Sequence, residues 1–373
     1  KRPWLQINDI HQRAKARINA LFEFISKLGL PFFTFHDRDV APEGSNLKES
    51  IANLQALTDY MGQKMQETGI NLLWGTANLF SHPRYMAGAA TNPNPEVFAY
   101  AVAQVKAAFD ATRALNGANY VLWGGREGYE TILNTDLRQE AEQFARFLSL
   151  LVDYKHKTGF KGLLLIEPKP CEPTKHQYDF DSGHVLAFLT KYGLEQEFKV
   201  NIEANHATLA GHSFPEEVAY ACAHNIFGSI DANRGDPQLG WDTDQFPNDI
   251  QDITLVLYTM LKHGGFTSGG FNFDAKVRRP SIDLEDLFYG HIGGVDTIAR
   301  GLINAANLLE NSRLQSFVEK RYQGWHSGLG NDILQKKVSL EEISKIALNN
   351  NFDPQPVSGR QEYLENCLNY DIK

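Results

Sequence analysis

The stretch IANLQALTDYMGQKMQETG at 51–69, followed by INLLWGT at 70–76, decides the fold. Ile51, Leu54, Met61 and Met65 fall on one face of a helix at this spacing, and Gly69 suits a helix end. The run 71–76 is apolar and carries no charge, which is typical of a strand buried on both faces of a parallel sheet. The stretch therefore predicts a helix that packs on the buried strand following it.

The same alternation continues in both directions along the chain. Further strand-like runs lie at 31–36, 119–123, 162–166, 199–203, 226–231 and 270–274. Helical patterns separate them: one opens at Asn94-Pro95 and ends at Gly117, and another covers Leu137 to Leu151 and stops before Gly159. Repeated βα units of this length predict a parallel α/β fold.

The order of the units narrows the fold further. A helical pattern at 7–28 precedes the first strand-like run, and seven βα units follow. We therefore expect a TIM-type (β/α)₈ barrel that lacks its first strand, from a chain truncated at its N-terminus. The alternative is a doubly wound open sheet, but no G-x-G-x-x-G follows any strand-like run. We expect a barrel domain over 1–303 and a helical arm for subunit contacts over 304–373.

Composition excludes several classes of protein. The chain has 373 residues, 42% of them hydrophobic, and a formal net charge of −9. This charge would repel a nucleic acid, and no apolar run is long enough to cross a membrane. The three cysteines are widely spaced and odd in number, which favours a reducing cytoplasm over a disulfide framework.

Carboxylates recur where the strand-like runs end. Glu167, Glu203, Asp231 and Asp274 each stand at or beside such an end, and barrel active sites lie at that edge of the strands. Four converging carboxylates cannot all ionise without compensation. An all-oxygen set suits Mg²⁺ or Mn²⁺, so we expect a metal site. Helix caps and surface acids are the alternative explanation.

A second group follows in the segment 235–247. Asp242 and Asp244 are two residues apart, so in extended backbone both point to one side. Glu203 and His206 could join them in a site with one imidazole, better suited to Mn²⁺ or Co²⁺. A solvated loop is the commoner reason for a D-x-D pattern.

Candidate catalytic groups lie beside these acids. His36 and Asp39 end the first strand-like run, and a His with a nearby carboxylate can act as a general acid or base. Lys169 lies two residues beyond Glu167, where its charge could polarise a carbonyl oxygen. The structural alternatives are a packed core histidine and a salt bridge from the lysine to one of the acids.

Aromatic residues near the same strand ends could line a pocket for a small polyol. Trp74, Phe80 and Trp123 are placed in this way, and we assign Thr76, which ends the run 71–76, to substrate binding with them. Ordinary core packing is the alternative for the three rings.

Together these motifs closely resemble the longer-chain class of bacterial-type xylose isomerases. The matching segments are FHDRDVAPEG (35–44), IEPKP (166–170), KHQYDFD (175–181), VNIEANHATLAGH (200–212), SIDANRGD (229–236), GWDTDQFP (240–247) and GGFNFDAKVRR (269–279). The resemblance implies a homotetramer of (β/α)₈ barrels that uses two divalent metals. It also implies interconversion of D-xylose with D-xylulose, and of D-glucose with D-fructose.

The resemblance further implies a role for each candidate. His36 and Asp39 would open the sugar ring, Lys169 would bind the substrate O1, and Trp74 and Trp123 would wall the pocket. The implied ligands are Glu167, Glu203, Asp231 and Asp274 for one metal, and Glu203, His206, Asp242 and Asp244 for the other. A metal-assisted 1,2-hydride shift would follow ring opening, and an enediol route through His36 remains open. A metal-dependent phosphodiester hydrolase and a catalytically silent metal-binding barrel are the rival classes.

Overall fold

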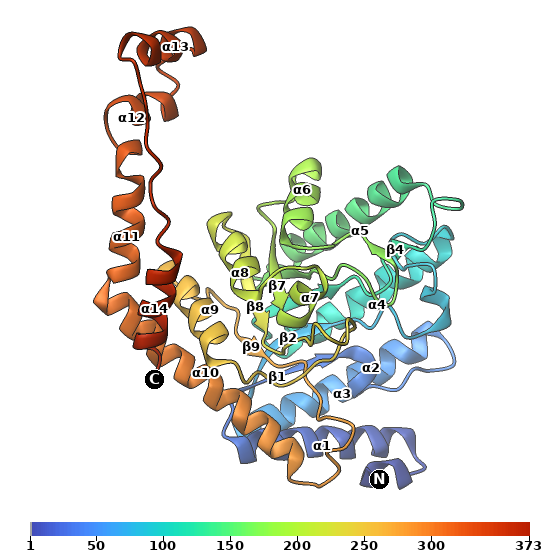
Figure 1. Cartoon of the computed structure of the whole chain (residues 1–373). Helices are drawn as coiled ribbons and strands as arrows, with labels where there is room; N and C mark the ends of the chain where they lie inside the picture. The colour runs from blue at the N-terminus through green and yellow to red at the C-terminus, as the bar shows by residue number, and fades with distance from the viewer. Residues whose placement is uncertain (1) are drawn as a thin grey trace.

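A computed structural model describes residues 2–373 of the chain. Seven parallel strands form one sheet in chain order, with helices around it (Figure 1). The strands are β1 (Phe32–His36), β2 (Asn71–Thr76), β3 (Asn119–Trp123), β5 (Leu163–Glu167), β7 (Phe198–Glu203), β8 (Phe227–Asp231) and β9 (Phe271–Asn272). This order confirms the expected barrel-type α/β fold, with β1 and β9 at the two ends of the sheet. The Thr34 hydroxyl donates to the side-chain oxygen of Asn272 at 3.4 Å and connects those ends.

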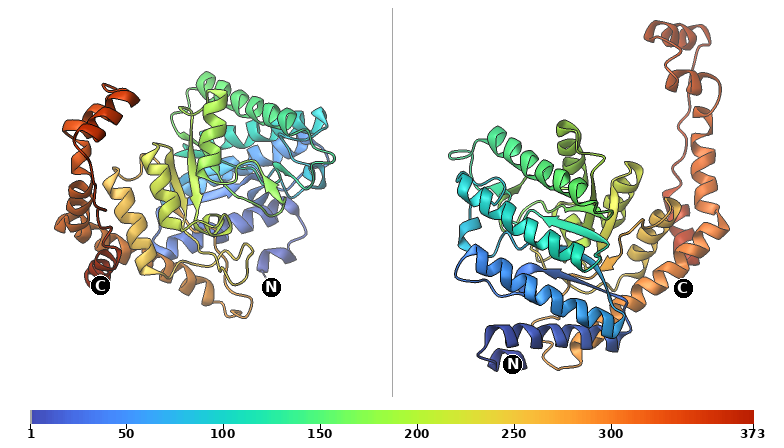
Figure 2. Two further views of the ribbon diagram at one scale, coloured as in Figure 1. Left: turned by 45° about the horizontal axis from the view of Figure 1, so that its top comes forward. Right: turned by 180° about the vertical axis from the view of Figure 1, so that it is seen from behind.

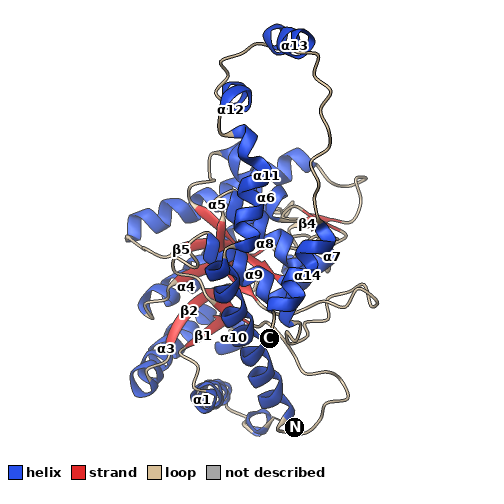
Figure 3. Ribbon diagram, turned by 60° about the vertical axis from the view of Figure 1, so that its left-hand side comes forward, coloured by secondary structure: helices blue, strands red, loops and turns tan. Residues whose placement is uncertain are grey.

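The helices cover the outer side of the sheet, as Figure 3 shows in blue around the red strands. They are α1 (Ile10–Leu28), α3 (Leu47–Thr68), α4 (Pro95–Ala114), α5 (Leu137–Thr158), α6 (Ser182–Tyr192), α8 (Phe214–Ala223), α9 (Ile250–Lys262) and α10 (Asp286–Asn311). Short helices α2 (Asp37–Val40) and α7 (Ala204–Leu209) directly follow β1 and β7. Three 3₁₀ turns lie at Pro3–Gln6, Pro83–Tyr85 and Gln323–Trp325.

Local signals explain most of the helix ends. The side chain of Asn46 accepts a hydrogen bond from the Glu49 N–H at the start of α3, and Gly69 ends that helix with a φ of 76°. The expected end of α4 at Gly117 was wrong. The Leu115 N–H bonds back to Ala111 and Asn116 takes a φ of 52°, so the chain leaves the helix earlier.

The core lies between the strands and these helices. Large side chains with less than 2% exposure include Tyr120, Leu148, Leu164 and Phe198. Burial of each such side chain contributes about 1.5–3 kcal/mol. The continuous apolar pattern of the strands therefore reflects burial on both faces.

Two strand features differ from the sequence prediction. The last strand, β9, ends at Asn272, so Asp274 follows the strand rather than ending it, with a φ of 39°. A two-residue antiparallel pair, β4 (Gly128–Tyr129) with β6 (His176–Gln177), joins the segments after β3 and β5. Strands of two residues carry no periodic signal, so the sequence could not indicate them.

Beyond α10 the chain leaves the barrel as α11 (Arg313–Tyr322), α12 (Gly328–Leu334) and α13 (Leu340–Asn349), and these helices stand away from it in both views of Figure 2. None of the three contains a buried residue. A further helix, α14 (Gln361–Asp371), returns to α10, where the Lys373 N–H donates to Asn304 Oδ1 at 3.2 Å. Among the described residues no helix combines the length and apolar character that a membrane span needs.

Candidate metal and sugar site

A cavity of about 320 Å³ opens at the carboxyl ends of the strands. It brings together residues from segments more than 200 positions apart, including His36 after β1 and Asp274 after β9. All the candidate site residues line it except Thr76 and Glu203. Glu203 lies among the clustered acids with 1% exposure. Thr76 has a different placement, because its hydroxyl donates to the Val121 carbonyl at 2.6 Å and joins β2 to β3.

The first group of acids is closely packed. Glu167, Glu203, Asp231 and Asp274 each offer a carboxylate oxygen, and these atoms lie within 4.8 Å of one another. Burial raises the pKa of Glu167 and of Glu203 well above the ordinary value, and neighbouring carboxylates act in the same direction. Burial also raises the pKa of Asp231 to about 7. Such a cluster favours protonation or a bound cation.

The second group shares Glu203 with the first. One oxygen each of Glu203, Asp242 and Asp244 lies within the same 4.8 Å limit. His206 Nε2 lies 3.3 Å from Glu203 Oε2 and 3.5 Å from Asp242 Oδ2. Burial lowers the pKa of His206, which favours the neutral imidazole that a metal binds.

Two lysines neutralise part of this negative charge. Lys169 Nζ lies 2.6 Å from Asp242 Oδ2, and Lys276 pairs with Asp244. Burial opposes ionisation of Asp242, but His206, Asp244 and Lys169 outweigh it and lower the pKa of this carboxyl. The salt bridge considered for Lys169 from sequence is therefore present, with Lys169 facing the cavity as well.

Aromatic rings line another part of the cavity. The Phe80 ring lies 4.3 Å from the Trp123 ring and 5.8 Å from the His36 imidazole, measured between centroids, in both cases edge to face. The Trp74 ring lies 6.3 Å from that imidazole. His36 Nδ1 is 3.6 Å from Asp39 Oδ2, and the Asp39 side chain is 70% exposed. The arrangement offers an apolar wall with one titratable pair at its edge.

Several polar residues of the site were missed from sequence. Asn201 donates to Glu167 Oε2 and to Asp231 Oδ2, each at 2.9 Å, and so links two acids of the first group. Asn233 donates to Glu203 Oε1 at 2.6 Å, and Asn205 donates to Asp242. The available signal was spacing, because Asn201 lies two positions before Glu203 on one strand and shares its face.

These residues fit a divalent metal. The oxygen-rich donor set, the single neutral imidazole and the raised carboxyl pKa values match hard or borderline cations. Among the described residues, Asp231 Oδ1 and His206 Nδ1 are buried without a hydrogen-bond partner, and buried polar atoms in folded proteins normally have one. The buried acidic and histidine cluster thus supports divalent metal binding.

Several solved structures share this fold at low sequence identity. D-psicose 3-epimerase from Clostridium cellulolyticum H10 aligns with a TM-score of 0.55 at 12% identity, covering 76% of this chain and 93% of that one. A xylose isomerase domain protein from Alicyclobacillus acidocaldarius aligns with a TM-score of 0.54 at 12% identity, covering 76% and 94%. At these identities the likeness supports the barrel fold alone.

Proteins related in sequence are far more similar to this chain. Residues 318–372 match the family described as the XylA2 C-terminal domain. Xylose isomerase of Burkholderia multivorans is 60% identical over 372 residues, which is 100% of this chain and 84% of that protein. Xylose isomerase of Photobacterium profundum is 61% identical over 368 residues, covering 99% and 84%. Because identity of this level extends along the whole chain, the protein belongs to the xylose isomerase family.

Proposed function

We propose that this chain is an aldose–ketose isomerase that converts D-xylose to D-xylulose and also D-glucose to D-fructose. The observation that carries the proposal is one cavity in which clustered metal-type ligands face a His–Asp pair, a lysine and an aromatic wall. The relatives at about 60% identity are named xylose isomerase, which favours these sugars. A phosphodiester hydrolase would favour more histidine ligands and a basic surface, and the net charge of −9 is against it.

Two divalent ions per subunit are part of the proposal. Glu167, Glu203, Asp231 and Asp274 would hold one, and Glu203, His206, Asp242 and Asp244 would hold the other. When bound, Mg²⁺, Mn²⁺ or Co²⁺ supplies Lewis-acid polarisation of the sugar oxygens and lowers the pKa of a coordinated hydroxyl group.

The remaining residues would bind and orient the sugar. His36, with its Nδ1 facing Asp39, would move a proton from the O1 hydroxyl to the ring oxygen as the ring opens. Lys169 would place its ammonium group at O1 and polarise the carbonyl of the open chain. Trp74, Phe80 and Trp123 would pack on the C–H faces of the sugar and keep water from C1 and C2. Hydride would pass from C2 to C1 as the O2 hydroxyl loses its proton and O1 gains one, so that no protein base is needed at carbon.

The C-terminal part of the chain would serve assembly. We propose the division into a barrel over 1–303 and an arm over 304–373, with the arm contacting other subunits of a homotetramer. The described α11, α12 and α13 contain no buried residue, and Leu340 and Leu348 are 80% and 75% exposed, which supports a partner surface there. The three cysteines are free, and we propose a cytoplasmic location.

The test is an assay of ketose formation by the purified chain in saturating Mg²⁺, with D-xylose and D-glucose as substrates. The Lys169→Met variant removes the charge proposed to act at O1. It should lose about a hundredfold or more of kcat/KM, since an electrostatic contact to developing charge is worth several kcal/mol. Lys161→Met, outside the cavity lining, is the matched control. Equal rates for the two variants would contradict the role of Lys169, and no ketose from the unaltered chain would contradict the proposed function.

A further inference from the structure

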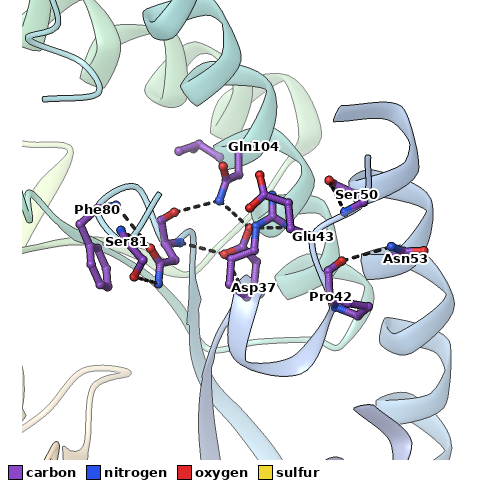
Figure 4. Close-up of polar contacts among 12 residues, drawn as sticks. Asp37, Pro42, Glu43, Ser50, Asn53, Phe80, Ser81 and Gln104 are labelled. Atoms are coloured by element: carbon purple, nitrogen blue, oxygen red, sulfur yellow. Dashed lines mark hydrogen bonds and ion pairs between the residues drawn. The ribbon is translucent and has the colours of Figure 1, made fainter. Parts of the chain in front are cut away.

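A buried carboxylate, Asp37, lies directly after His36 but does not line the cavity. Its exposure is 0%. One carboxylate oxygen accepts hydrogen bonds from the Arg38 and Asn78 N–H groups, each at 2.8 Å, and the other accepts from Gln104 Nε2 at 2.8 Å. Figure 4 shows these contacts converging on Asp37. A carboxylate in this position is stabilised by its donors, so it fixes the groups that donate to it.

The most consequential of these groups is Asn78, which begins the segment after β2. Asn78 Oδ1 accepts from the Ser81 N–H at 2.9 Å and from the Phe80 N–H at 3.3 Å. Asn78 Nδ2 donates to the Ser81 hydroxyl at 2.9 Å. An asparagine side chain bonded to the backbone two and three residues ahead closes a turn. This turn sets the direction in which Phe80 leaves the backbone (Figure 4).

Gln104 on α4 requires an acceptor at residue 37. Its Nε2 donates both to Asp37 Oδ2 and to the Asn78 carbonyl, the latter at 3.0 Å. Its Oε1 accepts from the Tyr85 hydroxyl at 2.7 Å, and Tyr85 is fully buried. A flipped amide would point Oε1 at the Asn78 carbonyl oxygen. The Gln104 orientation is therefore fixed, and only an acceptor at residue 37 satisfies it.

Phe80 is the point at which this network reaches the cavity. Its carbonyl accepts from Arg126 Nε at 3.0 Å. A Cβ placed on Gly125 would lie 2.8 Å from the Phe80 Cβ, so the space for the ring is narrow. With the ring 5.8 Å from the His36 imidazole, a small shift of the turn changes the cavity wall beside the ring-opening pair.

We propose that Asp37 is a positioning residue, whose carboxylate holds the Asn78 turn and through it the Phe80 wall of the sugar cavity. This inference rests on the proposed isomerase function. It assigns Asp37 a role separate from that of His36 and Asp39 on either side of it: Asp37 contacts neither sugar nor metal, and acts on affinity for the sugar through Phe80.

The decisive variant is Asp37→Asn in the full chain. The asparagine side chain has one acceptor oxygen in place of the two carboxylate oxygens. Either Gln104 Nε2 or the Arg38 and Asn78 N–H groups therefore lose their acceptor. Loss of a hydrogen bond to a charged group should raise the KM for D-xylose about tenfold or more. Because Phe80 contacts the sugar before and during reaction, kcat should change much less than KM.

A double-mutant cycle separates this role from general destabilisation. In a Phe80→Ala background, Asp37→Asn should change KM less than about twofold, because the group through which it acts is absent. Asn78→Ala should raise KM in the same way and show the same dependence on Phe80. This second variant decides the question if Asp37→Asn does not fold.

Ser50→Ala is the matched control. Ser50 is 1% exposed and does not line the cavity, and its hydroxyl accepts from the N–H of Gly44 in the loop after α2 at 2.9 Å. It lies on the other side of Asp37 from Phe80 (Figure 4). This variant should lower the thermal unfolding midpoint and leave KM unchanged. The inference would be overturned if Asp37→Asn and Asn78→Ala left the KM for D-xylose unchanged. It would also be overturned if their effects on KM persisted fully in the Phe80→Ala background. An unaltered chain that makes no ketose would instead refute the proposed function.

Discussion

At the scale of the residue, we expect the His36 imidazole to act in ring opening rather than in hydride transfer. His36 faces Asp39 at 3.6 Å and lies outside the groups of metal-type ligands. His36→Asn should therefore slow ring opening, by about a hundredfold for loss of a general acid–base group, and leave the later hydride transfer intact. Stopped-flow measurement with an open-chain aldose analogue should show most of the rate restored. Failure of that rescue would place His36 in the isomerisation itself.

Asp179 makes a separate prediction about pH and stability. Burial raises its pKa to about 7, and the charge of Glu127 acts in the same direction. Between the ordinary pKa of 3.8 and about 7 the folded state holds a proton that the unfolded state has lost. The free energy of unfolding therefore falls as pH rises through this window, by up to roughly 4 kcal/mol from this group.

Asp179→Asn removes that titration. Urea unfolding at pH 5 and pH 8 should show a smaller loss of stability with rising pH in the variant than in the unaltered chain. Asp136→Asn, at the surface N-cap of α5, is the control and should keep the unaltered slope. Parallel slopes for all three proteins would show that Asp179 is ionised in the folded state throughout.

At the scale of the element, the sequence predicted the strands. It did not predict the polar side chains that contact the acids at the strand ends. Burial on both faces leaves an apolar run with no charge before its last residue, and the sequence signals for β2 and β5 arise in this way. The carboxylates at strand ends indicated Glu167, Glu203 and Asp231, because parallel strands bring their ends to one edge. Asn233 and Lys276 pair with Glu203 and Asp244 from distant segments, which no local pattern encodes. Asn201 shares the face of Glu203 on β7, but its bonds to Glu167 and Asp231 depend on the folded sheet. The grouping of His206 with Glu167 as well as Glu203 likewise depends on three-dimensional packing.

Two glycines of the helices give predictions of opposite sign for the free energy of unfolding. Gly69 ends α3 with a φ of 76°, whereas Gly293 lies inside α10 without a positive φ, and a Cβ added to it would meet no atom within 4 Å. Gly69→Ala should lower the free energy of unfolding by about 1 kcal/mol through strain, and Gly293→Ala should raise it by a similar amount. Thermal unfolding of the two variants checks both signs. A loss of stability in Gly293→Ala would indicate that this face of α10 has no room for a methyl group.

At the scale of the whole molecule, we predict that the C-terminal arm carries a surface that contacts another subunit. Leu340 and Leu348 are strongly exposed on α13, and such apolar surface favours contact with another subunit. Leu340→Lys combined with Leu348→Lys should convert the proposed tetramer to smaller species in light scattering, with little change in the barrel's unfolding midpoint. Glu341→Lys on the same helix is the control and should stay tetrameric. A tetramer that survives the double substitution would place the main interface elsewhere.

The central claim is that the acids at the strand ends act by holding divalent metals for isomerisation. The direct measurement is the rate of D-xylulose formation from D-xylose after exhaustive EDTA treatment and dialysis, and again after addition of Mg²⁺, Mn²⁺ or Co²⁺. We predict that activity falls to background without metal and returns as the metal content approaches two ions per chain. Full activity in the metal-free protein would contradict the account.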